Sequence, residues 1–358
     1  MIIRLKYVQF IYFCKTKLSL NKFQKINQEF KYNYPTYWPK ILIVLFIIIN
    51  RIIMLNLYNK VSNILLSFDE KMKFYSTKKF AIIRKLECPQ CGFFSFYIIH
   101  LGCINKYLSE GYIPIIDLQS FSNVYNKNKT LKQNPWELFF YQPYNYTLEE
   151  VLRFAKNITY FICISQLFRP SELNIYYQKY SINFWHNFAK KYMPVRNEII
   201  QEVKIIMQKL FFNSRNILGV KLRGTDFLSL KPKAHSIQPK VEQVILDVKE
   251  MDRKFKYDFI FFATEDELIK QKFLPEFGEK LKLYNPNVII QYNYNDTYLI
   301  NLNEKINGNL EYIKNYLINI IILSNCLDLI TSKGCGPAGI FILTKGFRNT
   351  KVYDLGCY

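Results

Sequence analysis

The chain has 358 residues, of which 50% are hydrophobic and 22% are charged, and this composition excludes a disordered, collagen-like or coiled-coil protein. At about 150 residues per domain, the length corresponds to about two domains that each bury their own core. The net charge of +21 suits a phosphate-bearing partner or an anionic membrane surface, but lysine is spread along the whole chain. We therefore expect an enzyme with a phosphate-bearing substrate and no nucleic-acid partner.

The N-terminal region is basic and aromatic, and Glu29 is its only acid before Asp69. The apolar run at residues 41–49 falls short of the about 20 residues that a membrane-spanning helix needs. It is typical of a signal-like segment or a weak anchor, although an amphipathic surface segment, a buried strand or an extension outside the fold stays open. Peripheral or anchored membrane contact through this region therefore stays one of the alternatives, and the expected location is either membrane-associated or cytoplasmic.

The eight cysteines are scattered without the regular spacing of a small disulfide scaffold, which favours reduced thiols. Cys88 and Cys91 form the one close pair. Together with His100 and Cys103 they make a four-ligand zinc set on paper, but a turn with buried thiols is the favoured interpretation.

The middle of the chain shows the pattern of an α/β unit. A helix at residues 104–110 is followed by Gly111 and an apolar strand at 112–116. Residues 147–150 contain a capping box that predicts a helix start. Apolar residues then recur at helical spacing over residues 185–212.

The second half alternates strands with helices. The expected strands lie at 217–223, 257–262, 288–292 and 327–330, a long helix lies at 310–323, a small-residue loop at 331–339, and a last segment at 352–355. Strands of this kind end in polar loops, which predicts a parallel sheet with a ligand at the carboxyl ends of its strands.

Arg223 is the sharpest candidate for ligand binding because it ends an apolar strand. Its guanidinium can grip a diphosphate through paired hydrogen bonds, and the alternative is an ion pair with Asp226. After the next strand, Thr264 and Asp266 can bind a base or ribose, or they can cap a helix. His235 lies in a basic loop and is either a general base or a solvated residue.

The loop at residues 331–339 offers hydroxyls and backbone amides for a phosphate. It lacks the GK[ST] ending of a Walker A loop, which argues against ATP hydrolysis of that type. Its glycines do not follow the first strand of a dinucleotide-binding unit, so we do not expect an oxidoreductase.

Three motifs occur in a familiar order: GVKLRGTD at 219–226, FFATED at 261–266 and LSNCLDLITS at 323–332. They resemble those of the GT-B fucosyltransferases, the superfamily of α-1,6-fucosyltransferases, the nodulation fucosyltransferase and protein O-fucosyltransferases. The resemblance implies an α/β, GT-B-like fold with two Rossmann-like domains facing a cleft. The expected division is a basic extension at 1–80, an acceptor-side domain at 81–213 and a nucleotide-sugar-binding domain at 214–358.

In the first family motif, the arginine that grips the donor diphosphate falls on Arg223, but the family histidine falls on Lys221 and a second arginine on Gly224. The glutamate base of the α-1,6 enzymes has Lys231 near its place. The resemblance therefore does not carry over the base, and we assign proton transfer to Asp226 or His235. The donor-binding residues expected from the three motifs are Gly219, Lys221, Arg223, Thr225, Thr264, Asp266, Asp328, Thr331 and Ser332.

The resemblance implies a metal-independent, inverting transfer of fucose from GDP-fucose to a hydroxyl of a glycan, without a cofactor. The chain has no Asp-x-Asp triplet of the kind that holds a divalent cation on a sugar nucleotide. Cationic side chains and a helix dipole must then stabilise the departing diphosphate. The alternative is a non-catalytic protein that binds a nucleotide or sugar on the same fold, which the changes at Lys221, Gly224 and Lys231 would allow.

Overall fold

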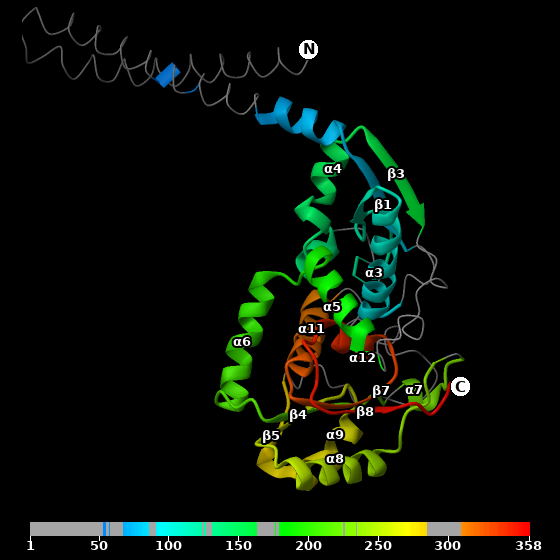
Figure 1. Ribbon diagram of the computed structural model, residues 1–358, viewed down its shortest axis with the longest axis vertical. Helices are drawn as coiled ribbons and strands as arrows, with labels where there is room; N and C mark the ends of the chain where they lie inside the picture. Colours follow the sequence, from blue (N-terminus) through cyan, green and yellow to red (C-terminus); the bar gives the residue numbers. More distant parts are fainter. Residues whose placement is uncertain are drawn as a thin grey trace, which may run out of the picture. The chain divides into compact units, whose positions relative to one another are not determined.

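The computed structural model describes residues 53–54, 57, 67–85, 91–123, 125–126, 131–162, 176, 179–224, 226–233, 235–284 and 309–358. The chain divides into two compact units, Met1–Lys71 and Met72–Tyr358, and both β-sheets lie in the second (Figure 1). Within the described ranges, no helix is both long enough and apolar enough to cross a membrane. The run at residues 41–49 lies outside them, so membrane contact stays a prediction. The proposed boundary at residue 213 also stays a prediction.

The first sheet has three parallel strands in the order β2-β1-β3. Its elements are β1 (Lys79–Arg84), α3 (Phe93–Ser109), β2 (Ile113–Ile116), α4 (Leu148–Phe154) and β3 (Asn157–Ile162), with short 3₁₀ helices at Pro135–Leu138 and Pro143–Asn145. Successive side chains of β1 point to opposite faces of the sheet. Phe80 and Ile82 pack in the cluster that includes α4, and Ala81 and Ile83 pack in the one that includes α3.

Two helices lead from the first sheet to the second, α5 (Lys179–Tyr192) and α6 (Asn197–Phe211). The second sheet has five parallel strands in the order β6-β5-β4-β7-β8. Its strands are β4 (Ile217–Lys221), β5 (Phe259–Ala263), β6 (Leu281–Lys282), β7 (Asp328–Ser332) and β8 (Thr350–Tyr353). Its helices are α7 (Asp226–Ser229), α8 (Val241–Phe255), α9 (Glu267–Phe277), α11 (Leu310–Ser324) and α12 (Cys335–Leu343), with a 3₁₀ turn at Gly278–Lys280.

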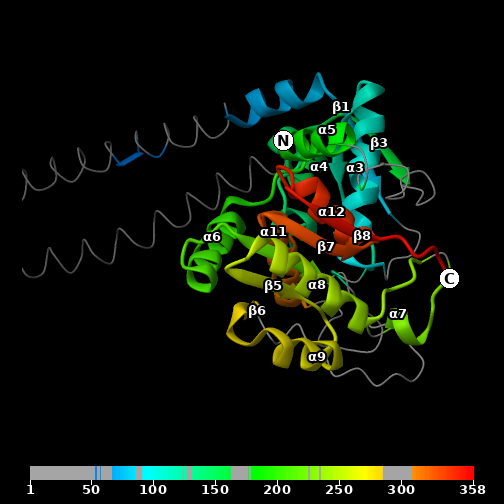
Figure 2. The same cartoon turned by 60° about the horizontal axis from the view of Figure 1, so that its bottom comes forward.

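Helices cover both faces of this second sheet. Leu218 and Val220 of β4 pack with α8 and α9, whereas Ile217 of the same strand packs in the cluster that contains α11 and α12. Figures 1 and 2 show α8 and α9 on one side of the sheet and α11 and α12 on the other. The strand order, read along the chain, is that of a Rossmann-like sheet. The expected α/β fold with two Rossmann-like sheets is therefore confirmed.

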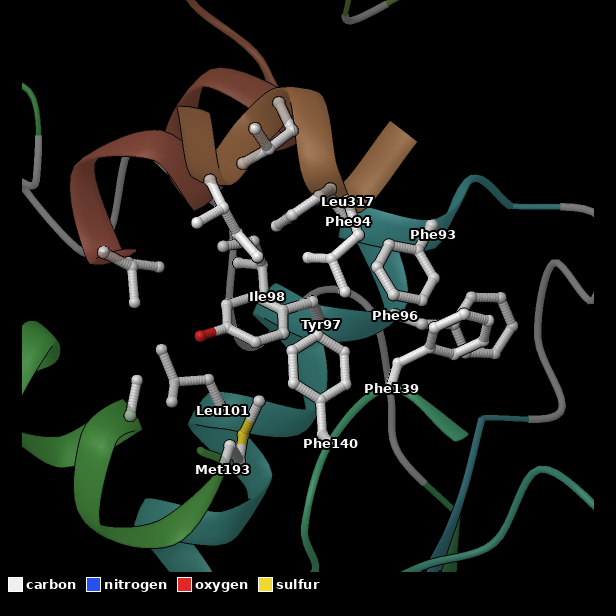
Figure 3. Packing of buried hydrophobic residues seen from close by; sticks show 14 of the residues in the cluster. Phe93, Phe94, Phe96, Tyr97, Ile98, Leu101, Phe139, Phe140, Met193 and Leu317 are labelled. Atoms are coloured by element: carbon white, nitrogen blue, oxygen red, sulfur yellow. The ribbon is translucent and has the colours of Figure 1, made fainter. Parts of the chain in front are cut away.

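The largest apolar core lies around α3 and includes residues of both sheets. Figure 3 shows Phe94 and Tyr97 of α3 near Leu317 of α11. Helix α12 packs against α3, and a Cβ atom added to Gly339 would lie only 2.1 Å from the Phe94 ring. A residue without a side chain is therefore needed where these two helices meet. This packing brings α12, which follows β7, against the first helix of the other sheet.

Several elements differ from the prediction. The single helix expected at 185–212 is two helices, because Pro194 cannot continue a helix and residues 194 and 196 bond instead to residues 141 and 139. The expected helix at 104–110 is the end of the longer α3. Residues 331–339 are only partly a loop, since α12 begins at Cys335. The strand expected at 288–292 lies outside the described residues.

Two cysteines correct the expectation of reduced thiols. Cys91 and Cys103 are each disulfide-bonded. Helix α3 rises about 15 Å from Phe93 to Cys103 at 1.5 Å per residue, and Cys91 lies only two residues before it, so the two cysteines are too far apart to bond to each other. Because a disulfide sulfur cannot ligate zinc, the alternative zinc set is wrong. Cys326, Cys335 and Cys357 are free thiols.

Candidate functional site

The candidate site lies at the carboxyl edge of the five-stranded sheet. Strands β5 and β6 follow β4 on one side of it, and the later strands β7 and β8 lie on its other side. In open parallel sheets, ligands bind at such a reversal of strand order, beyond the carboxyl ends of the two central strands. Arg223 follows β4 by two residues, and α12 begins three residues after β7. The sequence-predicted arginine and the predicted phosphate loop therefore flank this reversal.

A buried ion pair lies beneath Arg223. Lys221 Nζ donates a hydrogen bond to Glu265 Oε2 at 2.9 Å, and both side chains are at most 10% exposed. Arg223 Nε lies 3.6 Å from the other carboxylate oxygen, Oε1. Burial alone would raise the pKa of Glu265, but the positive charges of Lys221 and Arg223 outweigh it and hold the pKa below its ordinary value. Glu265 therefore stays ionised and fixes two cations at the strand ends.

The guanidinium of Arg223 also stacks on an aromatic ring. Its central carbon lies 3.8 Å from the centre of the Phe227 ring, in α7, and 37% of the Arg223 side chain is exposed. Burial raises the pKa of the Cys335 thiol at the start of α12, and the charge of Arg223 opposes that rise. Arg223 is therefore held by Glu265 and Phe227, close to the positive end of the α12 dipole, with part of its side chain open to a ligand.

After β5, Asp266 caps a helix. Its Oδ1 accepts hydrogen bonds from the amides of Leu268 and Ile269, at 2.9 and 3.3 Å, at the start of α9. Thr264 Oγ1 accepts the Asp266 amide at 3.2 Å. A Cβ atom at Gly224 would lie 2.2 Å from Asp266 Oδ2, so the turn after β4 leaves no room for a side chain at this position. These contacts are the ones expected if Thr264 and Asp266 cap the helix. A direct contact of Thr264 or Asp266 with a donor stays a proposal.

After β7, the side chains hold a turn in place. Ser332 Oγ donates to Gln238 Oε1 at 2.7 Å, and Thr331 Oγ1 donates to the Ser332 carbonyl at 3.2 Å. Both hydroxyl residues are buried. The Tyr176 hydroxyl accepts the amide of Gly334 at 3.0 Å and donates to its carbonyl at 2.6 Å. These bonds order the approach to α12, where the predicted phosphate cradle lies.

Two predicted donor-binding residues do not lie at this edge, and a contact of either one with a donor stays a prediction. Asp328 is the first residue of β7, at the opposite end of the strand, where Arg348 Nη2 at 2.6 Å and the Asn349 amide at 2.7 Å donate to its carboxylate. Gly219 lies inside β4, and a Cβ atom there would lie 3.1 Å from Cys326 Sγ of the α11 side. Asp328 therefore joins β7 to the turn before β8, and Gly219 allows α11 to approach the sheet.

The two candidates for proton transfer follow β4. Asp226 begins α7. His235 is exposed, its Nδ1 lies 3.1 Å from the Lys233 carbonyl, and its ring meets the Phe227 ring edge to face at 5.1 Å. His235 and Arg223 thus both contact the Phe227 ring. Thr225 lies outside the described residues.

Sequence reasoning missed two residues at this edge. Glu265 lies in the second motif, FFATED, but is not among the predicted donor-binding residues, although an acid just after a strand that neighbours Lys221 and Arg223 could have indicated an ion pair. Tyr316 comes from the middle of α11 and carries no such signal. Burial raises the pKa of its phenol well above the ordinary value, Arg223 lowers it and Glu265 raises it further. A Cβ atom at Gly336 would lie 2.3 Å from the Tyr316 hydroxyl, which places this hydroxyl at the start of α12.

The first sheet has its own charged carboxyl edge. Arg84 at the end of β1 donates from Nε to Asp117 Oδ2 at 2.7 Å. Lys85 is fully buried beside the Phe96 ring. Its positive charge opposes the rise that burial causes in the pKa of the Cys335 thiol of α12. Across the ranges that the structure describes, no group of three or more His, Cys, Asp or Glu side chains could hold a metal ion.

Two parallel sheets of Rossmann-like order, with a cationic edge at the strand reversal, define this protein as a two-sheet α/β protein. No family model matches the chain, and no curated protein matches it by sequence.

Among solved structures, the chain is similar to the fucosyltransferase NodZ from Bradyrhizobium, at 14% identity over 75% of this chain and 93% of that one, with a TM-score of 0.42. It is also similar to NodZ α-1,6-fucosyltransferase co-crystallised with GDP, at 13% identity over 75% and 93% of the two chains, with a TM-score of 0.42. POFUT1 in complex with GDP-fucose is 8% identical over 77% and 98%, with a TM-score of 0.43.

Proposed function

We propose that the protein is a glycosyltransferase that transfers fucose from GDP-fucose to a hydroxyl of a glycan, with inversion and without a metal. The observation that carries the proposal is the position of Arg223, a partly exposed guanidinium at the strand reversal beside the start of α12. A diphosphate fits this place because it can take paired hydrogen bonds from the guanidinium and the favourable field of the helix.

In the proposed reaction, the acceptor hydroxyl oxygen forms a bond to the anomeric carbon of the sugar. The bond from that carbon to the β-phosphate oxygen breaks, and GDP leaves with the electron pair. Arg223 and the start of α12 stabilise the negative charge that develops on the departing diphosphate. The acceptor proton passes to Asp226 or His235 as the general base. Lys221 acts indirectly, because its ammonium group is held by Glu265.

The experiment that tests donor binding is a thermal-shift panel with GDP, UDP, CDP and ADP and no added metal. A ligand at 100 times its Kd adds about 2.7 kcal/mol to the free energy of unfolding, a readily measured shift. We expect selective stabilisation by GDP that is lost in Arg223→Ala. The matched control is Arg253→Ala, which removes an exposed arginine from the last turn of α8. Equal stabilisation of wild type and Arg223→Ala would contradict the assignment of Arg223.

A second function, nucleotide or sugar binding without catalysis, is favoured by one observation. The two positions that depart from the family motif, Lys221 and Gly224, are built into the structure: Lys221 pairs with Glu265, and Gly224 packs against Asp266. Release of GDP from GDP-fucose in the presence of a glycan mixture separates the two functions. A binding protein is stabilised by GDP but releases none, whereas the transferase releases GDP in proportion to the fucosylated product.

A further inference from the structure

A relay of contacts leads from the last residues of the chain to Arg223. We propose that residues 354–358, hereafter the strap, position the Arg223 guanidinium for the donor diphosphate, and that they act through His235 and Phe227. This inference rests on the proposed function of Arg223, and it adds the strap and the Phe227 ring as positioning elements that touch no substrate.

The first contact is the stack of Arg223 on Phe227, at 3.8 Å. A guanidinium that lies flat on a ring keeps one plane, and that plane decides where its paired donors point. Phe227 belongs to α7, which is only four residues long. A single helical turn is unstable by itself, so the position of the Phe227 ring depends on its neighbours.

The second contact joins that ring to His235. The His235 ring meets the Phe227 ring edge to face, with centroids 5.1 Å apart and planes at 88°. His235 lies in an exposed loop, where its amide bonds to the Pro232 carbonyl at 3.0 Å. Local bonds of this kind shape the turn but do not tie it to the sheet.

The third contact ties the loop to the sheet. The Tyr358 amide donates to the His235 carbonyl at 3.0 Å, and the Ile237 amide donates to the Gly356 carbonyl at 3.0 Å. These two bonds flank an antiparallel bridge between Ser236 and Cys357. Figures 1 and 2 both place the end of the chain beside α7.

The strap is itself anchored at its other end. It continues β8, whose residues pair with β7. The Asp354 carboxylate also forms an ion pair with Lys333 Nζ, at 2.6 Å, next to the turn that starts α12. One short segment therefore connects the start of α12 with the His235 loop, the two parts of the chain that flank Arg223.

The test removes one backbone hydrogen bond. Tyr358→Pro deletes the amide that His235 accepts, and the control Tyr358→Ala removes the side chain but keeps the amide. Gly356 has φ +83° and open space, so Gly356→Ala strains the strap without a clash. Its control is Gly346→Ala, which has φ +128° and equally open space, but precedes β8.

The readouts are the NMR signal of the Arg223 Nε–H group and the Kd for GDP. Because the guanidinium lies over the Phe227 ring, this proton is shielded in the wild type. We expect Tyr358→Pro and Gly356→Ala to reduce the shielding and to weaken GDP binding about three- to tenfold, the effect of about one hydrogen bond. In a Phe227→Leu background, Tyr358→Pro should have no further effect, because the relay is already broken.

An unchanged Arg223 signal in Tyr358→Pro overturns the proposal, and so does an equal change in Tyr358→Ala or Gly346→Ala. The NMR signal needs no donor. If the wild type binds no GDP, the proposed function fails, while the Arg223 signal still decides whether the strap positions this side chain.

Discussion

Lys221 and Glu265 form a buried ion pair between the ends of two neighbouring strands, with 2.9 Å between Nζ and Oε2. The same carboxylate lies 3.6 Å from Arg223 Nε. The last residue of β4 is thus paired with an acid that follows β5 by two residues. The two charges can be buried together, because each compensates the desolvation of the other.

Breaking this pair should destabilise the protein. Lys221→Met leaves the buried Glu265 with Arg223 as a more distant cation, and we expect a loss of about 3 to 5 kcal/mol in the free energy of unfolding. The double variant Lys221→Met/Glu265→Gln should recover a large part of that loss. Urea denaturation measures both values. As a control, Lys272→Met breaks an exposed pair with Glu242 and should leave the midpoint unchanged. Equal stability of Lys221→Met and wild type would contradict a structural role for the pair.

Gly224 should tolerate no side chain. In Gly224→Ala the new methyl group would lie 2.2 Å from Asp266 Oδ2 and 2.6 Å from Ile269 Cδ1, so the start of α9 must move. We expect destabilisation by about 1 to 3 kcal/mol, together with weaker GDP binding, because the turn also carries Arg223. Gly92→Ala, which adds a methyl group in open space, is the control for both measurements. Unchanged stability of Gly224→Ala would show that this turn is loosely packed.

His100 should make stability depend on pH. Burial lowers the pKa of this fully buried histidine from 6.5 to about 4; the hydrogen bond to the Phe96 carbonyl opposes the shift, the charge of Lys85 adds to it and that of Asp117 opposes it. Between pH 6.5 and 4 the unfolded chain therefore takes up a proton that the folded protein refuses. Stability should fall as pH falls through this window, by about 3 kcal/mol in total.

Urea denaturation at pH 7, 6 and 5 measures that fall. The variant His100→Phe should flatten it, whereas the control His235→Phe, at an exposed histidine, should not. The same slope in His100→Phe and wild type would assign the acid sensitivity to other groups.

Asp328 should matter for stability and not for the donor. Its buried carboxylate accepts hydrogen bonds from Arg348 and Asn349 at the amino end of β7, away from Arg223. Asp328→Asn leaves Arg348 without its anionic partner, and we expect a loss of about 3 kcal/mol. The Kd for GDP, measured by titration calorimetry well below the unfolding temperature, should match that of the wild type. A tenfold weaker Kd would return Asp328 to the donor site.

Activity should survive removal of divalent cations. In the proposed mechanism, the charge on the departing diphosphate is balanced by Arg223 and the start of α12, so no step needs a metal. GDP release measured with and without EDTA should give equal rates, and Arg223→Lys, which keeps the charge but loses the paired donors, should be slower by about tenfold or more. Loss of activity in EDTA that Mg²⁺ or Mn²⁺ restores would contradict the metal-free mechanism.

The elements with strong local signals were predictable. The capping residue Thr147 accepts the Glu150 amide at 3.1 Å and starts α4, as its spacing indicates. The apolar strand that ends near Arg223 lies in the centre of the second sheet. The break at Pro194 was missed because helical periodicity continues on both sides of it. It depends on backbone bonds to residues 139–141, which local spacing does not reveal.

By itself, the sequence determined the α/β class, the parallel order of strands and helices, and the place of Arg223 just after the central strand. These features follow from local patterns, since apolar strands, helix caps and glycine turns act over a few residues. Only the tertiary structure decided which charges meet. Glu265 reaches Lys221 and Arg223 because β5 lies beside β4, and Asp328 is separated from them by the length of β7. Distances across a sheet depend on strand order and register, which neighbouring residues in the sequence do not encode.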